Sequence, residues 1–329
     1  MYYHKIKKTK VLKNKKAKFL QLKPIQKILD FSKKVVIPGF DGIPLYYVAA
    51  FFFKGISKGY LTTRAAAIAF SFFLAIFPII LVFFTLIPFI PINNFQEALM
   101  AFINNIVPNS AESTINSTLI DIIERPRGGL LSLTFFLALF FATNGFSSIV
   151  DAFNNTYHPM ETKTWFKQRL IALVMFSINS LIVIIAIVLL TSGSSFFEYL
   201  LEKHILNNWT TFYLLEGVKW VILTSMFFFS ISFIYYLAPA KKNKFRFISA
   251  GSSLATFLSI IASVGFNFYV QNFSSYNALY GSIGTLLIIL MWIYFNAIIL
   301  LIGFELNASI QQAKNDSKIY FSKDENFQL

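Results

Sequence analysis

Six long blocks of apolar residues, separated by polar stretches, dominate this chain. A block of about 20 residues crosses roughly 30 Å of hydrocarbon as an α-helix. A soluble domain would interrupt such blocks with polar residues at helical or strand spacing. The pattern therefore predicts an all-α, polytopic membrane bundle of about six transmembrane helices. We place the helices at residues 65–87, 130–150, 170–191, 218–238, 247–270 and 283–306.

Shorter amphipathic segments flank these blocks. Apolar residues fall on one helical face of residues 45–60, which predicts a helix lying in the membrane interface. The alternative is that this segment extends the first span. In the long loop at 88–129, residues 95–106 and 115–123 show the same pattern and are expected to cap the bundle or rest on the interface.

The distribution of Lys and Arg predicts the orientation. The loops at 151–169 and 239–246 and the two ends of the chain are basic, whereas the loop at 271–282 has no charged residue. Basic loops stay in the cytoplasm. With six spans all four basic segments fall on one side, so both termini are expected to be cytoplasmic, as a Lys-rich tail at 1–44 and a C-terminal tail at 313–329.

Composition narrows the classes of function. Apolar residues make up 56% of the chain and charged residues 13%, against about a quarter charged in soluble domains. The chain has no Cys and three scattered His, so thiolate chemistry is excluded and no metal or other cofactor is expected. No P-loop or HExxH motif is present.

The net charge of +14 comes from the N-terminal part of the chain. Residues 1–64 hold 15 Lys and Arg against Asp30 and Asp41. Anionic lipid headgroups are the expected partner of this tail. RNA phosphates would attract it without specificity, so no specific nucleic acid partner is expected.

Three charged residues are expected at one depth near the cytoplasmic side. Arg64 opens the first span, Asp151 follows the second, and Glu305 lies near the end of the sixth. We predict that Arg64 pairs with one of the two carboxylates and ties these three spans together. A structural clamp is favoured over a proton relay.

Other polar and helix-breaking positions are candidates for a substrate path. Asn144, Asp151 and Asn155 share one helical face, which indicates either a polar path or a helix end rising into the headgroups. Pro78 removes a backbone hydrogen bond within the first span, so we expect a packing kink or a gating hinge. Close helix contacts are expected at Gly251, Gly265, Gly281 and Gly284.

Three segments together resemble the YihY/BrkB family of bacterial inner-membrane proteins. They are RAAAIAFSFFLAIFP at 64–78, NGFSSIVDAFNNTY at 144–157, and YGSIGT, WIY and GFELNA within 280–308. The resemblance covers residues 45–312 and implies six spans in the bacterial cytoplasmic membrane. Members are often labelled ribonuclease BN, and the family is linked to envelope integrity and to movement of lipids or glycolipids.

Three functions remain open. The first is a transporter or flippase for an envelope lipid or related amphiphile, which a sideways-opening cavity lined by Asn144, Asp151 and Glu305 would favour. The second is a scaffold that binds envelope proteins, which a tightly packed bundle would favour. The third is a membrane-bound ribonuclease, for which the sequence offers no acid–base or metal cluster, so we expect no enzyme.

Overall fold

A computed structural model describes residues 23–86, 128–156, 164–202, 209–239, 247–272 and 282–325, and these residues form helices and no strands. The expected helices at 95–106 and 115–123 lie outside the described residues. Two short helices come first, α2 (Lys23–Ser32) and α3 (Leu45–Lys58). The longer ones are α4 (Leu61–Leu86), α7 (Gly128–Asn154), α8 (Trp165–Glu202), α9 (Trp209–Leu237), α10 (Ala250–Asn272) and α12 (Ser282–Glu325).

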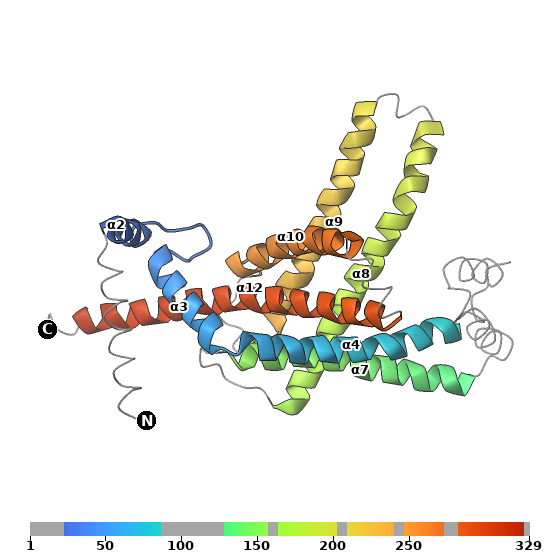
Figure 1. Ribbon diagram of the computed structural model, residues 1–329, viewed down its shortest axis with the longest axis horizontal. Coiled ribbons are helices and arrows are strands. Elements are labelled where there is room, and N and C mark those ends of the chain that lie inside the picture. Colours follow the sequence, from blue (N-terminus) through green and yellow to red (C-terminus); the bar gives the residue numbers. More distant parts are fainter. Residues whose placement is uncertain are drawn as a thin grey trace.

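The six longer helices are all long and apolar enough to cross a membrane. The predicted all-α fold class and the six spans are therefore confirmed. Figure 1 shows α4, α7, α10 and α12 running along the long axis of the molecule, while α8 and α9 leave this group together at a steep angle. Helix α8 contacts α7 and α9, and α9 contacts α10.

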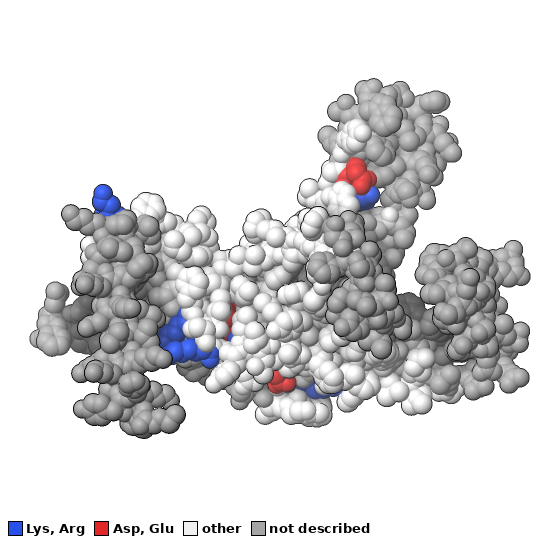
Figure 2. Space-filling model, in the orientation of Figure 1, with Lys and Arg blue, Asp and Glu red and all other residues white. Residues whose placement is uncertain are grey.

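The surface of this bundle is nearly uncharged. In Figure 2 the described surface is mostly white, with charged atoms over α2 and α3, near the far end of α9, and at the lower edge of the molecule near the start of α8. These places carry Lys54 and Lys58 on α3 and Glu216 and Lys219 on α9. The middle of the bundle instead exposes large apolar side chains, which suits contact with lipid.

The last helix is longer than its span. At 1.5 Å per residue the 44 residues of α12 extend about 66 Å, roughly twice the hydrocarbon thickness. The helix continues past the predicted end of the span at 306, so residues 313–325 of the predicted tail continue α12. Helix continues there because Ile310 and Ala313 are buried against Phe40 and Val48 in a second apolar cluster.

The N-terminal segment therefore packs on the C-terminal half of α12. Lys314 Nζ lies 2.6 Å from Asp41 Oδ2, next to this cluster. The described parts of the two chain ends meet at one end of the bundle, as Figure 1 shows. Such a contact is expected for six spans, because an even number of crossings returns the chain to the side of the membrane on which it began.

Helix α3 is separate from the first span. Gly59 ends α3 by donating its backbone N–H to the Gly55 carbonyl oxygen at 2.7 Å, and Tyr60 adopts a left-handed φ of 48°. This turn excludes the alternative in which residues 45–60 extend the first span. The position of α3 in the membrane interface stays a prediction.

The core of the bundle is held by close packing. Lipid tails are as apolar as the side chains, so helices in a membrane associate through shape and polar contacts. The rings of Phe153 and Phe304 stack with centroids 3.9 Å apart, and Tyr235 lies edge-on to both. The Tyr235 hydroxyl donates to the Leu300 carbonyl oxygen at 2.6 Å.

Helices α10 and α12 cross at two glycines. A Cβ atom on Gly251 would lie 2.2 Å from the Gly303 carbonyl oxygen, and one on Gly303 would lie 2.6 Å from the Gly251 oxygen. The predicted close contact at Gly251 is confirmed. A Cβ on Gly265 would meet nothing within 4 Å, so the same prediction is wrong there. Gly281 lies outside the described residues.

Candidate functional site

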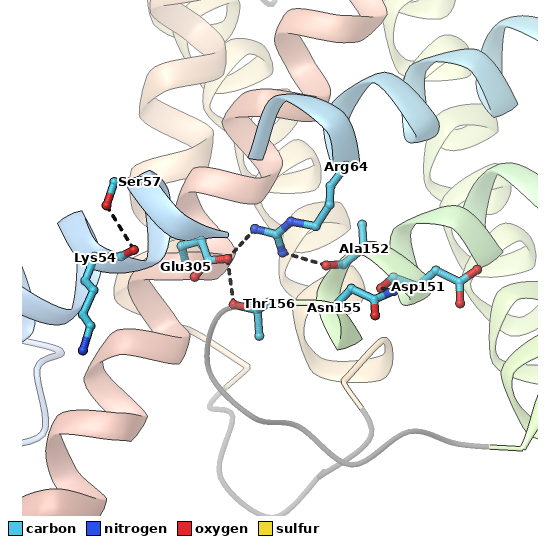
Figure 3. Close-up of polar contacts among 8 residues, drawn as sticks. All are labelled: Lys54, Ser57, Arg64, Asp151, Ala152, Asn155, Thr156 and Glu305. Carbon is cyan, nitrogen blue, oxygen red and sulfur yellow. Dashed lines mark hydrogen bonds and ion pairs between the residues drawn. The ribbon is translucent and has the colours of Figure 1, made fainter. Parts of the chain in front are cut away.

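A buried ion pair joins the first and last spans. Arg64, in the first turn of α4, is 7% exposed, and Glu305 on α12 is fully buried. Arg64 Nη2 donates to Glu305 Oε1 at 2.5 Å (Figure 3). Thr156, just after α7, donates its hydroxyl to the same oxygen at 2.7 Å. The predicted pairing of Arg64 with a carboxylate is confirmed, and Glu305 is the partner.

The same guanidinium also caps a helix. Arg64 Nη1 donates to the carbonyl oxygen of Ala152 at 2.7 Å. Because α7 ends at Asn154, the Ala152 carbonyl belongs to the last turn, whose oxygens lack intrahelical partners. A positive charge is also favourable at the negative end of a helix dipole. Arg64 therefore ties α4, α7 and α12 together.

The ion pair is tightly enclosed and incompletely hydrogen-bonded. Arg64 Nε and Glu305 Oε2 are buried without a hydrogen-bond partner in the part of the chain that the structure describes. A Cβ on Gly59 would lie 2.4 Å from the Gly55 carbonyl oxygen, 3.2 Å from Arg64 Nη2 and 3.5 Å from Glu305 Oε1. The turn between α3 and α4 thus forms one wall of the ion-pair site, and only glycine fits this wall without displacing its neighbours.

Asp151 does not join this ion pair. Although it neighbours Ala152, its side chain points away from Arg64 (Figure 3). Its Oδ1 accepts a hydrogen bond from Gln168 on α8. The equal depth of Arg64, Asp151 and Glu305 stays a prediction, and the Asp151 side chain lies on another face of α7 from the ion pair.

The predicted polar stripe of α7 faces the start of α8. Gln168 also approaches Ser147, at 3.5 Å, and Arg169 Nη1 donates to Asn144 Oδ1 at 3.4 Å. Asn155 extends the stripe by donating to the Asp151 backbone oxygen at 2.9 Å. Gln168 and Arg169 are consecutive in α8 and reach in opposite directions along α7. They donate hydrogen bonds to the side chains of Asp151 and Asn144 in its polar stripe.

Arg169 reaches the middle of α7. Its Nη2 donates to the Phe140 carbonyl oxygen at 3.1 Å, and its guanidinium carbon lies 4.7 Å from the centroid of the Phe140 ring. Phe140 and Asn144 flank the midpoint of the helix Gly128–Asn154. The sequence assigned Arg169 to a cytoplasmic loop, whereas the structure includes it in α8, against the middle of a spanning helix.

A groove opens between α7 and α8 beside this arginine. Its volume is about 630 Å³. Of the described residues that line it, Thr143 and Arg169 are polar, and the others are Leu133, Phe136, Leu137, Leu139, Phe140, Phe166, Leu170 and Leu173. The groove is an apolar trough with one positive charge.

A smaller cavity of about 290 Å³ lies among α4, α7, α9, α10 and α12. Ile231, Phe146 and Trp292 contribute to its mostly apolar wall, and Ser230, Ser259 and Asn296 are its polar residues. Neither space is lined by Asn144, Asp151 or Glu305, so the expected cavity with these three residues in its wall is not found in either. Asn144 borders the groove through its contact with Arg169.

The candidate hinge Pro78 lies within a continuous helix, and Asn307 joins two other helices. Pro78 is buried, and α4 continues through it as one helix, so its hinge role stays a prediction. Asn307 Oδ1 accepts from the Gly251 N–H at 2.9 Å, and its Nδ2 donates to Ser249 Oγ at 2.9 Å, which caps the start of α10.

Within the described ranges, no group of three or more His, Cys, Asp or Glu side chains is placed to hold a metal ion.

Comparison with known proteins gives one family. The family described as virulence factor BrkB matches residues 52–326. The putative ribonuclease-like protein YfkH of Bacillus subtilis is 28% identical over 257 residues, covering 77% of this chain and 90% of that protein. A UPF0761 membrane protein of Aggregatibacter aphrophilus is 25% identical over 275 residues, covering 82% and 93%. No solved structure matches the chain.

Proposed function

Since this chain belongs to the virulence factor BrkB family and is an integral membrane protein, we propose that it is a transporter or flippase for an envelope lipid or a related amphiphile. We propose further that it resides in the bacterial cytoplasmic membrane with both termini in the cytoplasm. The basic loops and tails support this orientation.

The groove between α7 and α8 is the observation that carries the proposal. An amphiphile that crosses a bilayer needs an apolar surface for its chains and a polar position for its headgroup away from the membrane surface. The groove supplies Leu and Phe side chains along its length and Arg169 against the middle of α7. Its volume falls within the range of roughly 300–1,000 Å³ that is usual for small-molecule sites.

Reconstitution tests the proposal directly. The purified protein is placed in vesicles that contain a trace of lipid with a fluorescent headgroup, and dithionite then bleaches the outer leaflet. We expect the protein to accelerate exposure of inner-leaflet lipid relative to empty vesicles. Leu137→Trp and Leu170→Trp fill the groove from α7 and α8 and should slow this exposure.

Leu181→Trp is the matched control. Leu181 lies on α8 with 58% of its surface exposed, and it does not line the groove. The control should transport lipid like the unmodified protein. Folded protein that leaves lipid exposure at the level of empty vesicles, with every lipid tested, would contradict the transport function.

A scaffold is the second candidate. Helices α8 and α9 leave the bundle and expose apolar side chains such as Ile184 and Val221, which are 58% and 66% exposed. An envelope protein could pack on this surface. A scaffold predicts that the two groove substitutions change neither lipid movement nor envelope integrity in cells.

We also propose that the chain is not a ribonuclease. The two carboxylates nearest the candidate site have structural partners, Glu305 in Arg64 and Thr156 and Asp151 in Gln168. RNA incubated with the purified protein and Mg²⁺ should remain intact. Cleavage that disappears in the Glu305→Gln variant would overturn this proposal.

A further inference from the structure

The groove also indicates which amphiphile it binds, if the proposed function is correct. We infer that its ligand is an anionic phospholipid whose phosphate is held by Arg169 and whose acyl chain lies between α7 and α8. The charge of Arg169, the hydrogen-bond donors it keeps available, and the composition of the groove all favour this ligand.

The charge of Arg169 has no ion-pair partner in the described residues. Arg64, the other arginine facing α7, pairs with Glu305. The nearest carboxylate to Arg169 on the stripe of α7, Asp151, is bound by Gln168 toward the other end of that helix. Arg169 is instead held by neutral groups, the Phe140 carbonyl and ring and the Asn144 amide. A guanidinium surrounded by apolar Leu and Phe side chains is costly unless an anion joins it.

The guanidinium keeps donors available for an anion. Arginine has five N–H donors, and the structure engages one each on Nη1 and Nη2. The bond to Asn144 is long, at 3.4 Å, so it is readily exchanged for a stronger acceptor. Phosphate oxygens match the fork of a guanidinium and accept two parallel hydrogen bonds from it.

The rest of the groove suits a hydrocarbon chain and nothing more polar. Apart from Arg169, Thr143 is the only polar residue among the described residues that line the groove. Its hydroxyl proton is already shared between the backbone oxygens of Leu139 and Phe140, at 2.7 and 2.9 Å. A sugar or peptide would leave its own polar groups unsatisfied there. A single charged end and a long apolar body therefore describe the ligand, which is the plan of a phospholipid.

Retention of lipid by the purified protein tests this assignment. The protein is exchanged into detergent with equal amounts of phosphatidylglycerol and phosphatidylcholine, and bound lipid is measured by native mass spectrometry. Both headgroups carry phosphate, but only phosphatidylglycerol has a net negative charge. We expect it to be retained about tenfold better, because the choline cation of phosphatidylcholine offsets the phosphate charge that Arg169 would bind.

Variants separate the site from the lipid shell around the protein. Arg169→Gln should abolish the preference, and Arg169→Lys should keep part of it. Lys167→Gln removes a neighbouring exposed charge that does not line the groove and should leave the preference unchanged. Leu137→Trp fills the groove from α7 and keeps the charge of Arg169, so reduced retention in this variant supports the site even where Arg169→Gln does not fold.

The outcomes distinguish this inference from the proposed function. Equal retention of both lipids, or a preference that survives Arg169→Gln, would overturn the inference even if the protein transports lipid in vesicles. A preference lost in Arg169→Gln, without transport of any lipid, would support the binding site and overturn the transport function.

Discussion

Arg64 and Glu305 are 241 positions apart in sequence, and their side chains meet at 2.5 Å between the first and last spanning helices. The contact closes the bundle, because α4 follows the N-terminal segment while α12 ends the described chain. The bond from Arg64 to the Ala152 carbonyl adds α7 to the same point. One side chain thus fixes the relative positions of three helices.

Breaking this pair should destabilise the protein strongly. Removing one member of a buried ion pair leaves the other charge buried and uncompensated, which costs about 3–5 kcal/mol. We expect Arg64→Ala and Glu305→Ala each to lower the melting temperature of the purified protein in detergent and the yield of folded protein in the membrane. Size-exclusion chromatography after heating measures the melting temperature. The same chromatography of solubilised membranes without heating measures the yield of folded protein.

Lys33→Ala provides the control for this experiment. Lys33 pairs with Asp30 at 3.3 Å, with both side chains about half exposed or more. Exposed pairs contribute about 0–1 kcal/mol, so this variant should melt close to the unmodified protein. Equal stability of the Arg64, Glu305 and Lys33 variants would show that the buried pair is not a clamp.

Reversing the two charges should not restore stability. In the double variant Arg64→Glu with Glu305→Arg, the new carboxylate faces the Ala152 carbonyl at the negative end of α7, and Thr156 loses its acceptor. The apolar double variant Arg64→Leu with Glu305→Leu removes both charges and leaves only neutral groups unsatisfied. We expect it to melt at a higher temperature than the reversed pair, and the opposite order would refute the capping role of Arg64.

The crossing of α10 and α12 should be intolerant of side chains. Gly251→Ala and Gly303→Ala place a Cβ within 3.0 Å of the facing backbone, so the helices must separate. Overpacking of this kind costs about 1–3 kcal/mol, which a lower melting temperature should report. Gly265→Ala has open space around its Cβ and serves as the control. If all three variants melted alike, the close crossing would be absent.

Much of the architecture follows from the sequence because bilayer thickness sets a length that apolar blocks must meet. The same reasoning gives depth, and depth paired Arg64 with a carboxylate. It does not give the direction in which a side chain leaves its helix, so it could not select Glu305 over Asp151. Thr156, which contacts Glu305 from the end of α7, also lacked any signal in the pattern.

The groove depends on a crossing angle that no local pattern specifies. Arg169 was assigned to a basic loop because it follows Lys163 and Lys167. The oblique course of α8 brings its guanidinium to Phe140, and this angle results from packing between α7 and α8 rather than from either sequence alone. The sequence shows only that Arg169 directly precedes the predicted span at 170–191. It does not show that the side chain reaches the middle of α7.

Cysteine labelling tests the proposed orientation without background, because the chain contains no native Cys. Gly129 at the start of α7 is exposed, and a side chain there meets nothing within 4 Å. Ser57 on α3 is exposed too, and its hydroxyl donates to the Lys54 carbonyl oxygen of the same helix. Both residues should tolerate replacement by Cys. Helix α4 separates them, so they should lie on opposite sides of the membrane.

In right-side-out membrane vesicles, a membrane-impermeant maleimide should therefore label Gly129→Cys and leave Ser57→Cys unlabelled until detergent is added. In inverted vesicles the pattern should reverse, because the basic ends of the chain remain on the cytoplasmic face. Labelling of Ser57→Cys alone in right-side-out vesicles would place both termini outside the cytoplasm. Equal labelling of the two variants in sealed vesicles would mean that α4 does not cross the membrane, and the six-span topology would then fail with it.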